Sequence, residues 1–142
     1  MSCSGWANGR RAGGLPLAPN ELTQVLLPLL KKSEQGRIVN QSSIIGSLQV
    51  ISTDEQAAAW AGMAYASSKA ALNMVTVLQA TRLKGSQVKV NSAHPGWVKT
   101  DLGGDNAPMD VVTGAKTAVR LALLPADGPS GKFFHLGDAL PW

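Results

Sequence analysis

The chain has 142 residues and a formal net charge of +4, a size that suits one domain with a sizeable core. Its single cysteine, Cys3, excludes an internal disulfide and is compatible with a reducing compartment, so we expect a cytoplasmic protein. There is no basic stripe with interleaved aromatic residues, and no apolar run approaches the ~20 residues of a membrane span. Neither nucleic acid nor membrane is therefore an expected partner.

The chain begins with a segment that predicts no regular structure. Residues 1–19 are rich in Gly, Arg, Ser and Pro without periodicity, which is typical of a disordered leader. The glycines of residues 9–14 lack Gly-x-Gly-x-x-Gly spacing and follow no strand, so they do not indicate a phosphate loop. From Asn20, a residue that caps helices, the i, i+3, i+4 pattern predicts an amphipathic helix with an apolar face of Leu22, Val25, Leu26, Leu29 and Leu30.

Strands and helices then alternate along the chain. Residues 36–43 read as a short buried strand that ends in hydroxyl side chains, and residues 44–60 show little pattern and are expected to form a loop. Residues 63–83 predict a second helix, and residues 87–93 a second strand. A sharp turn at His94-Pro95-Gly96 follows, because Pro fixes one backbone dihedral and Gly permits another.

The last third of the chain continues the alternation. After a loop at residues 97–109, Asp110 or Thr113 can cap a third helix that ends by Pro125. Residues 131–135 predict a last strand, and residues 137–142 a tail. This order predicts an α/β fold with three parallel strands and flanking helices, in which ligands gather at the carboxyl ends of the strands.

One pair of residues suggests chemistry. Tyr65, the only tyrosine, and Lys69 are four positions apart near the start of the second predicted helix, so the phenol and the ammonium share a face. A nearby cation favours the phenolate and so assists a phenol in proton exchange near neutral pH. Such pairs also occur by chance, so the interpretation depends on the segments around them.

Four segments carry a family resemblance: residues 36–46, 65–73, 88–100 and 128–134. Their sequences, order and spacing resemble the short-chain dehydrogenases/reductases, near the carbonyl-reductase-like members. The resemblance covers residues 20–142 and is to the carboxyl-terminal half of that family's Rossmann-type domain. It implies NAD(P)-dependent conversion of a small-molecule carbonyl to an alcohol, or the reverse, with NADP or NAD as cofactor and no metal.

The resemblance also implies a role for individual residues. Ser43 matches the serine that hydrogen-bonds the substrate carbonyl oxygen, and Tyr65 matches the general acid/base. Lys69 matches the lysine that assists this tyrosine and holds the nicotinamide ribose. The segment expected to line the nicotinamide contains Pro95, Gly96, Val98 and Thr100.

The sequence departs from the family pattern in three ways. The family's glycine-rich phosphate loop has no counterpart here, and the position of its catalytic asparagine falls near Leu15, out of register with Asn20. Ser43 and Tyr65 are 65 − 43 = 22 positions apart, more than in many members, so the extra residues should border the substrate site. The alternative hypothesis is a truncated, inactive remnant that only self-associates, through its helices and the exposed edge of the residue 36–43 strand.

Other polar and aromatic residues have simpler interpretations. His94 and His135 are expected to pack or to stabilise turns, because no Cys or carboxylate cluster joins them. Trp60 and Trp142 are expected to cover edges of the core. Trp97 either contacts substrate or packs within its own loop, and the sequence leaves both open.

Overall fold

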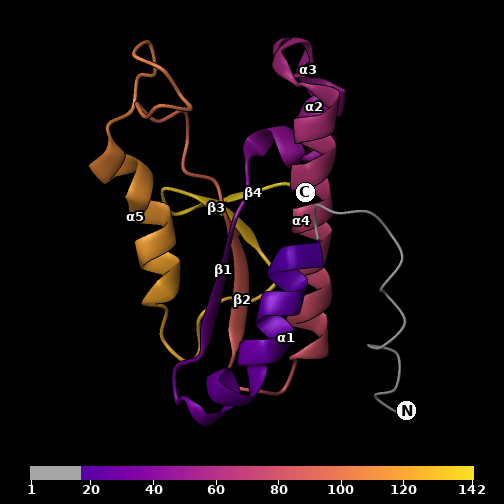
Figure 1. The fold of residues 1–142 in the computed structure, drawn as a ribbon, viewed down its shortest axis with the longest axis vertical. Helices are drawn as coiled ribbons and strands as arrows, with labels where there is room; N and C mark the ends of the chain where they lie inside the picture. The colour runs from indigo at the N-terminus through magenta and orange to yellow at the C-terminus, as the bar shows by residue number, and fades with distance from the viewer. Residues whose placement is uncertain (1–16) are drawn as a thin grey trace.

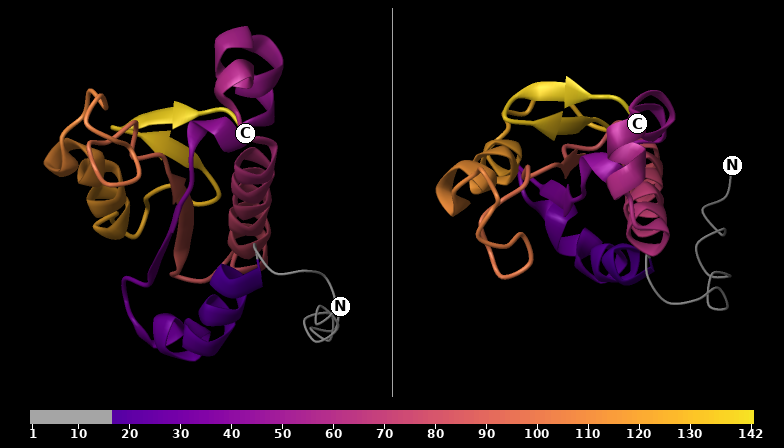
Figure 2. Two further views of the ribbon diagram at one scale, coloured as in Figure 1. Left: turned by 45° about the horizontal axis from the view of Figure 1, so that its top comes forward. Right: turned by 90° about the horizontal axis from the view of Figure 1, so that it is seen from above.

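The computed structural model describes residues 17–142. They form one four-stranded sheet, in the order β1-β2-β3-β4, with helices on both faces (Figures 1 and 2). Helices α1 (Leu17–Lys32) and α4 (Met63–Arg82) cover one face, and α5 (Val111–Ala122) covers the other. This layered arrangement confirms the predicted α/β fold class.

Three strands of the sheet run in parallel. β1 (Arg37–Gln41) pairs with β2 (Lys89–Ala93), and β2 pairs with β3 (Phe133–His135). Each of these strands lies within a segment that the sequence predicts as strand. β1 is an edge strand of the sheet in the described part of the chain.

The fourth strand corrects the prediction of a simple tail. β4 (Asp138–Leu140) pairs antiparallel with β3, so the sheet has four strands rather than three. The connecting residues Leu136 and Gly137 have φ angles of 47° and 112°. Two residues with positive φ favour a tight hairpin, which returns the chain along β3.

Helix α1 differs from its prediction in start and in orientation. It begins at Leu17, so Asn20 lies within the helix rather than at its cap, and the rest of the predicted leader is outside the described residues. Thr23 is buried, whereas the predicted core residues of this helix are largely exposed: Leu22 61%, Val25 75%, Leu26 41% and Leu29 64%. Most of the apolar stripe therefore faces away from the sheet.

The predicted loop at residues 44–60 is largely helical. It contains η2 (Ile44–Gly46), α2 (Leu48–Thr53) and α3 (Glu55–Trp60). The side chains of Ser43, Ser47 and Asp54 accept hydrogen bonds from main-chain amides at the starts of these helices. Helices of six residues or fewer are too short to show a helical period in the sequence, which explains the error.

Helix α4 lies on the sheet through apolar and polar contacts. The apolar cluster consists of buried and partly buried residues from four elements and their connections: Leu83, Val88, Val90, Leu27, Leu30, Ile38 and Ala80. Beside it, Asn40 Nδ2 donates to Thr76 Oγ1 at 2.8 Å, and the Thr76 hydroxyl is 2.8 Å from that of Ser92. Buried networks of this kind add rigidity, so the chain of hydrogen bonds fixes where α4 sits along β1 and β2.

Helix α5 starts where one of its two predicted caps lies. The Asp110 carboxylate accepts from the Thr113 amide at 2.8 Å and from the Thr113 hydroxyl at 2.9 Å. These hydrogen bonds hold the pKa of Asp110 below its usual value. Within residues 17–142, no helix has the length and apolar character needed to cross a bilayer.

Candidate active site

Ser43 is the second residue after β1, at the carboxyl end of the strand. It is 8% exposed, and its hydroxyl oxygen accepts from the Ile45 amide at 3.3 Å, which starts η2. A serine hydroxyl has one hydrogen to donate as well as lone pairs that accept. The bond to Ile45 uses a lone pair and leaves the hydroxyl hydrogen for another partner.

Tyr65 and Lys69 lie on the first turns of α4. The Lys69 ammonium is 5.6 Å from the centroid of the Tyr65 ring, and the two residues therefore share a face of the helix, as their spacing predicts. The ammonium donates to the carbonyl oxygen of Gln41, the last residue of β1, at 3.0 Å. An ammonium has three donors, so two remain for a ligand. Tyr65 is 46% exposed and open to solvent.

Main-chain contacts join the start of α4 to the segment after β1. Gly46 packs so closely on α4 that a β-carbon there would lie 2.6 Å from the carbonyl carbon of Lys69. The Ser42 hydroxyl donates to the carbonyl oxygen of Lys69 at 3.4 Å, and Asn73 Nδ2 donates to that of Gly46 at 3.2 Å. Ser43, which precedes η2, is thereby held beside the helix that carries Tyr65 and Lys69.

The turn after β2 lies at the same edge of the sheet. Gly96 has a φ of 90°, and a β-carbon there would be 2.8 Å from the Met109 sulfur, so this position requires glycine. Pro95 precedes it. Nδ1 of His94 accepts from the amide of Ile44 and from that of Gly96 at 3.3 and 3.4 Å. This turn is therefore adjacent to the segment that contains Ser43.

The other two residues predicted to line the nicotinamide have engaged side chains. The methyl groups of Val98 pack against Gly114 of α5, where a β-carbon would lie 2.5 Å from one of them. The Thr100 hydroxyl accepts from the Gly103 amide at 3.1 Å and donates to the Val98 carbonyl at 3.3 Å. Of the segment from Pro95 to Thr100, Gly96 is linked by hydrogen bonds to the Ser43 segment, through Nδ1 of His94.

The two histidines pack on each other, a pairing that the sequence does not indicate. Their ring centroids are 4.8 Å apart, and His135 Nδ1 is 3.0 Å from the carbonyl oxygen of His94. Burial lowers the pKa of His94 to about 4, with a smaller contribution from the charge of His135. In residues 17–142, no group of three or more His, Cys, Asp or Glu side chains is arranged to hold a metal ion.

An aromatic contact at this edge was missed by sequence reasoning. Trp60 is 74% exposed rather than covering the core, and its ring centroid is 6.4 Å from that of Trp97. Trp97 Nε1 donates to the Gly103 carbonyl at 2.8 Å, which orients this ring. The extra segment between Ser43 and Tyr65 therefore ends beside the loop that follows β2. No local pattern pairs these two tryptophans, since 37 positions separate them (97 − 60 = 37).

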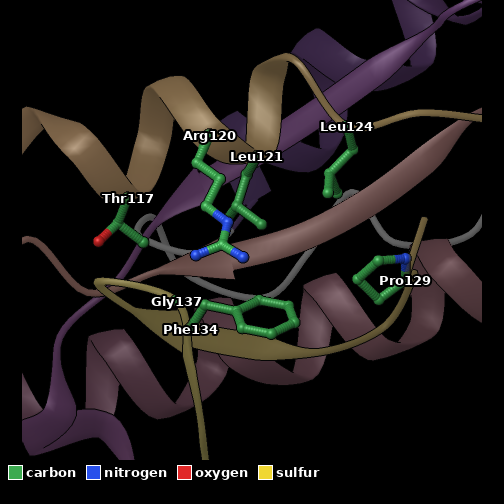
Figure 3. Close-up of a pocket in the computed structure, with 7 residues that line it drawn as sticks. All are labelled: Thr117, Arg120, Leu121, Leu124, Pro129, Phe134 and Gly137. Carbon is green, nitrogen blue, oxygen red and sulfur yellow. The ribbon is translucent and has the colours of Figure 1, made fainter.

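A small cavity of about 90 Å³ lies elsewhere, between α5 and the β3–β4 hairpin (Figure 3). In Figure 3 the Arg120 guanidinium extends from α5 over Phe134 and Gly137. Ligand pockets typically measure ~300–1,000 Å³, so this space is too small for a dinucleotide. No residue of α4 or η2 lines it, and it is separate from the candidate active site.

Known proteins resemble the chain in sequence and in fold. The family described as short chain dehydrogenase matches residues 17–110. "Carbonyl reductase [NADPH] 1" of Oryctolagus cuniculus is 33% identical over 117 residues, which cover 75% of this chain and 42% of that protein. The structure of the carbonyl reductase Sniffer of D. melanogaster is 35% identical with a TM-score of 0.75, covering 89% of this chain and 53% of that one.

A third relative is the NADPH-bound carbonyl reductase from chicken fatty liver, which is 33% identical with a TM-score of 0.74 and covers 89% of this chain and 51% of that one. The chain thus spans about half the length of the relatives it matches. Since the family match takes in β1, α4 and β2 together with the loops of the candidate site, the chain belongs to the short chain dehydrogenase family, among its carbonyl-reductase-like members.

Proposed function

We propose that this chain supplies the substrate and nicotinamide side of a cytoplasmic NAD(P)-dependent reductase that converts a small-molecule carbonyl to an alcohol, or the reverse. The observation that carries the proposal is that the segment with Ser43 packs on the first turns of the helix with Tyr65 and Lys69, at one edge of the sheet. Gly46 packs on Lys69, and Lys69 donates to Gln41, so strand end and helix form one unit.

The residues present fit the nicotinamide end of the cofactor. Lys69 has two N–H donors beyond the one that binds Gln41, and vicinal ribose hydroxyls are suitable acceptors. The cofactor-lining segment of the proposal contains Pro95, Gly96, Val98 and Thr100, of which Val98 would contribute main-chain atoms. When bound, the nicotinamide supplies the hydride. Relatives whose names include NADPH favour NADP over NAD.

The chain's own residues would handle the charge and the proton. Reduction places negative charge on the carbonyl oxygen, and the free hydrogen of the Ser43 hydroxyl can donate to that oxygen. The Tyr65 hydroxyl gives its proton to the same oxygen. Lys69, 5.6 Å from the Tyr65 ring centroid, stabilises the negative charge that this transfer leaves on the phenol. In the reverse direction the Tyr65 phenolate takes the proton of the alcohol, and Ser43 and Lys69 keep the same roles.

The test uses a chimera in which residues 17–142 follow the amino-terminal half of the chicken carbonyl reductase. A positioned proton donor contributes ~10²–10⁴-fold to rate, so Tyr65→Phe should lower kcat by about that factor while NADPH affinity stays the same. Lys69→Ala should reduce both kcat and the affinity for NADPH. Ser67→Ala, an exposed change on the same helix, is the matched control and should change neither. Turnover by the Phe variant within about tenfold of the parent would show that Tyr65 is not the acid.

A further inference from the structure

The His94 ring lies between two loops that follow different strands. Its Nδ1 is 3.3 Å from the amide nitrogen of Ile44 and 3.4 Å from that of Gly96. Both amides are donors, so Nδ1 is the unprotonated nitrogen and the ring hydrogen of the neutral form is on Nε2. A single ring nitrogen thus accepts from two segments that are 52 positions apart (96 − 44 = 52).

The position of Ile44 matters because Ser43 precedes it. The Ser43 hydroxyl oxygen accepts from the Ile45 amide, so the main chain of η2 sets the direction of this hydroxyl. Gly96 belongs to the turn proposed to line the nicotinamide. Nδ1 of His94 therefore sets the separation between the substrate-binding hydroxyl and this turn.

The charge on the ring decides whether this link exists. His135 of β3 is the ionisable group that faces the ring, whereas Ile44 and Gly96 present main-chain amides. His135 Nδ1 donates to the His94 carbonyl oxygen, since a carbonyl only accepts. A proton on Nδ1 of His94 would turn the acceptor into a donor that faces two other donors, and both hydrogen bonds would be lost.

We propose that His94 is a positioning residue of the site, on the basis of the function assigned to Ser43 above: its unprotonated Nδ1 holds the Ser43–Ile44 segment to the Pro95–Gly96 turn, and protonation of Nδ1 releases both. The role is separate from catalysis, because His94 acts through main-chain amides rather than on the reacting atoms. The consequence is a site whose geometry depends on pH through one ring.

NMR on the 142-residue chain tests the link directly. Long-range ¹H–¹⁵N spectra at pH 7 should show a protonated Nε2 and an unprotonated Nδ1 for His94. On acidification the Ile44 and Gly96 amide resonances should move together with the His94 ring signals, with a midpoint near pH 4, while the buried Asn91 amide of β2 serves as internal reference. A proton on Nδ1 at pH 7, or two amides that shift independently of the ring, would overturn the proposal.

Two substitutions separate hydrogen bonding from packing. His94→Asn places a non-titrating oxygen near the position of Nδ1, so both amides should keep their protection from hydrogen exchange and lose their acid transition. His94→Leu removes the acceptor, and exchange at Ile44 and Gly96 should rise about tenfold while Asn91 is unchanged. Equal protection of the Ile44 and Gly96 amides from hydrogen exchange in the Asn and Leu variants would show that His94 acts only by packing.

Each measurement is independent of cofactor and turnover. If the Leu variant does not fold, the ring signals and the titration of the parent chain still decide the proposal. A confirmed link combined with an unaffected Tyr65→Phe chimera would reject Tyr65 as the acid and keep the hydrogen-bonded link at His94. Loss of activity in the Tyr65→Phe chimera, without coupled shifts of the His94 ring and the two amides, would keep the reductase and reject the link.

Discussion

Ser43, Lys69 and Gly96 come from three separate segments, and each makes a hydrogen bond in which one partner is a main-chain atom. Ser43 accepts from an amide, Lys69 donates to a carbonyl, and Gly96 donates to the His94 ring. The contacts of Ser43 and Lys69 end on main-chain atoms, so they do not depend on the side chains of Ile45 and Gln41, whereas the contact of Gly96 depends on the His94 ring. The geometry of the site therefore depends on how closely the backbones approach, and at Gly46 the main chain of η2 lies tightly against that of α4.

Replacement of Gly46 by alanine should destabilise the protein. The added β-carbon would lie 2.6 Å from the Lys69 carbonyl carbon and 2.7 Å from its β-carbon, so η2 and α4 must separate. Overpacking of this kind typically costs ~1–3 kcal/mol, and urea denaturation should show a loss of that size in the free energy of unfolding. Gly62→Ala is the control, because no atom lies within 4 Å of the added carbon. Equal free energies of unfolding for the two variants would show that η2 and α4 can separate without loss of stability.

Helix α1 exposes several large apolar side chains to solvent. Leu22, Val25 and Leu29 are each more than half exposed, and they are three or four positions apart on one face. β1 beside it is also an edge of the described sheet, and unpaired edges invite pairing with another chain. Both features expose surface that a second chain can cover.

We expect the 142-residue chain to self-associate through these surfaces. The double variant Val25→Glu/Leu29→Glu should shift the population towards monomer, because it places charges in an apolar contact. Size-exclusion chromatography with light scattering measures the change. The control Gln35→Glu/Gln56→Glu adds the same charge at exposed polar positions and should not alter the mass. A parent chain that stays monomeric at high concentration would contradict the expectation.

Under the proposed function, residues 17–142 taken as one body supply only the nicotinamide end of the site. Dinucleotide affinity in this fold comes largely from the pyrophosphate, bound at a Gly-x-Gly-x-x-Gly turn between strand and helix. No such turn joins a strand to a helix within the described residues. The proposed contacts are the Lys69 ammonium and the segment from Pro95 to Thr100.

The 142-residue chain alone should therefore show no saturable NADPH binding and no carbonyl reduction. One charge-assisted hydrogen bond contributes ~1.5–3 kcal/mol, whereas immobilising a ligand costs ~4–15 kcal/mol. A titration that follows nicotinamide fluorescence tests this prediction, with the chimera as the positive control. Tight, saturable binding that Lys69→Ala abolishes would show that this chain holds the cofactor by itself.

The parts of this protein that the sequence alone determined are those set by short-range spacing. The i, i+4 interval placed Tyr65 and Lys69 on one face of α4, and strand patterns located β1, β2 and β3. The sequence offered Asp110 or Thr113 as the cap of α5, and Asp110 takes this role through a bond to an amide three residues away. In each case the interacting groups lie within one turn or one strand, so the local residue order specifies the geometry.

Only the tertiary structure decided the contacts between distant segments. The apolar pattern of α1 marked a face but not the direction in which it points, since burial depends on which elements lie beside the helix. The return of β4 along β3, the approach of Trp60 to Trp97 and the two amides at His94 likewise depend on where other segments fold. Such contacts join residues tens of positions apart or whole strands. No local period in the sequence indicates them, because the distance between the partners is fixed only once the chain between them has packed.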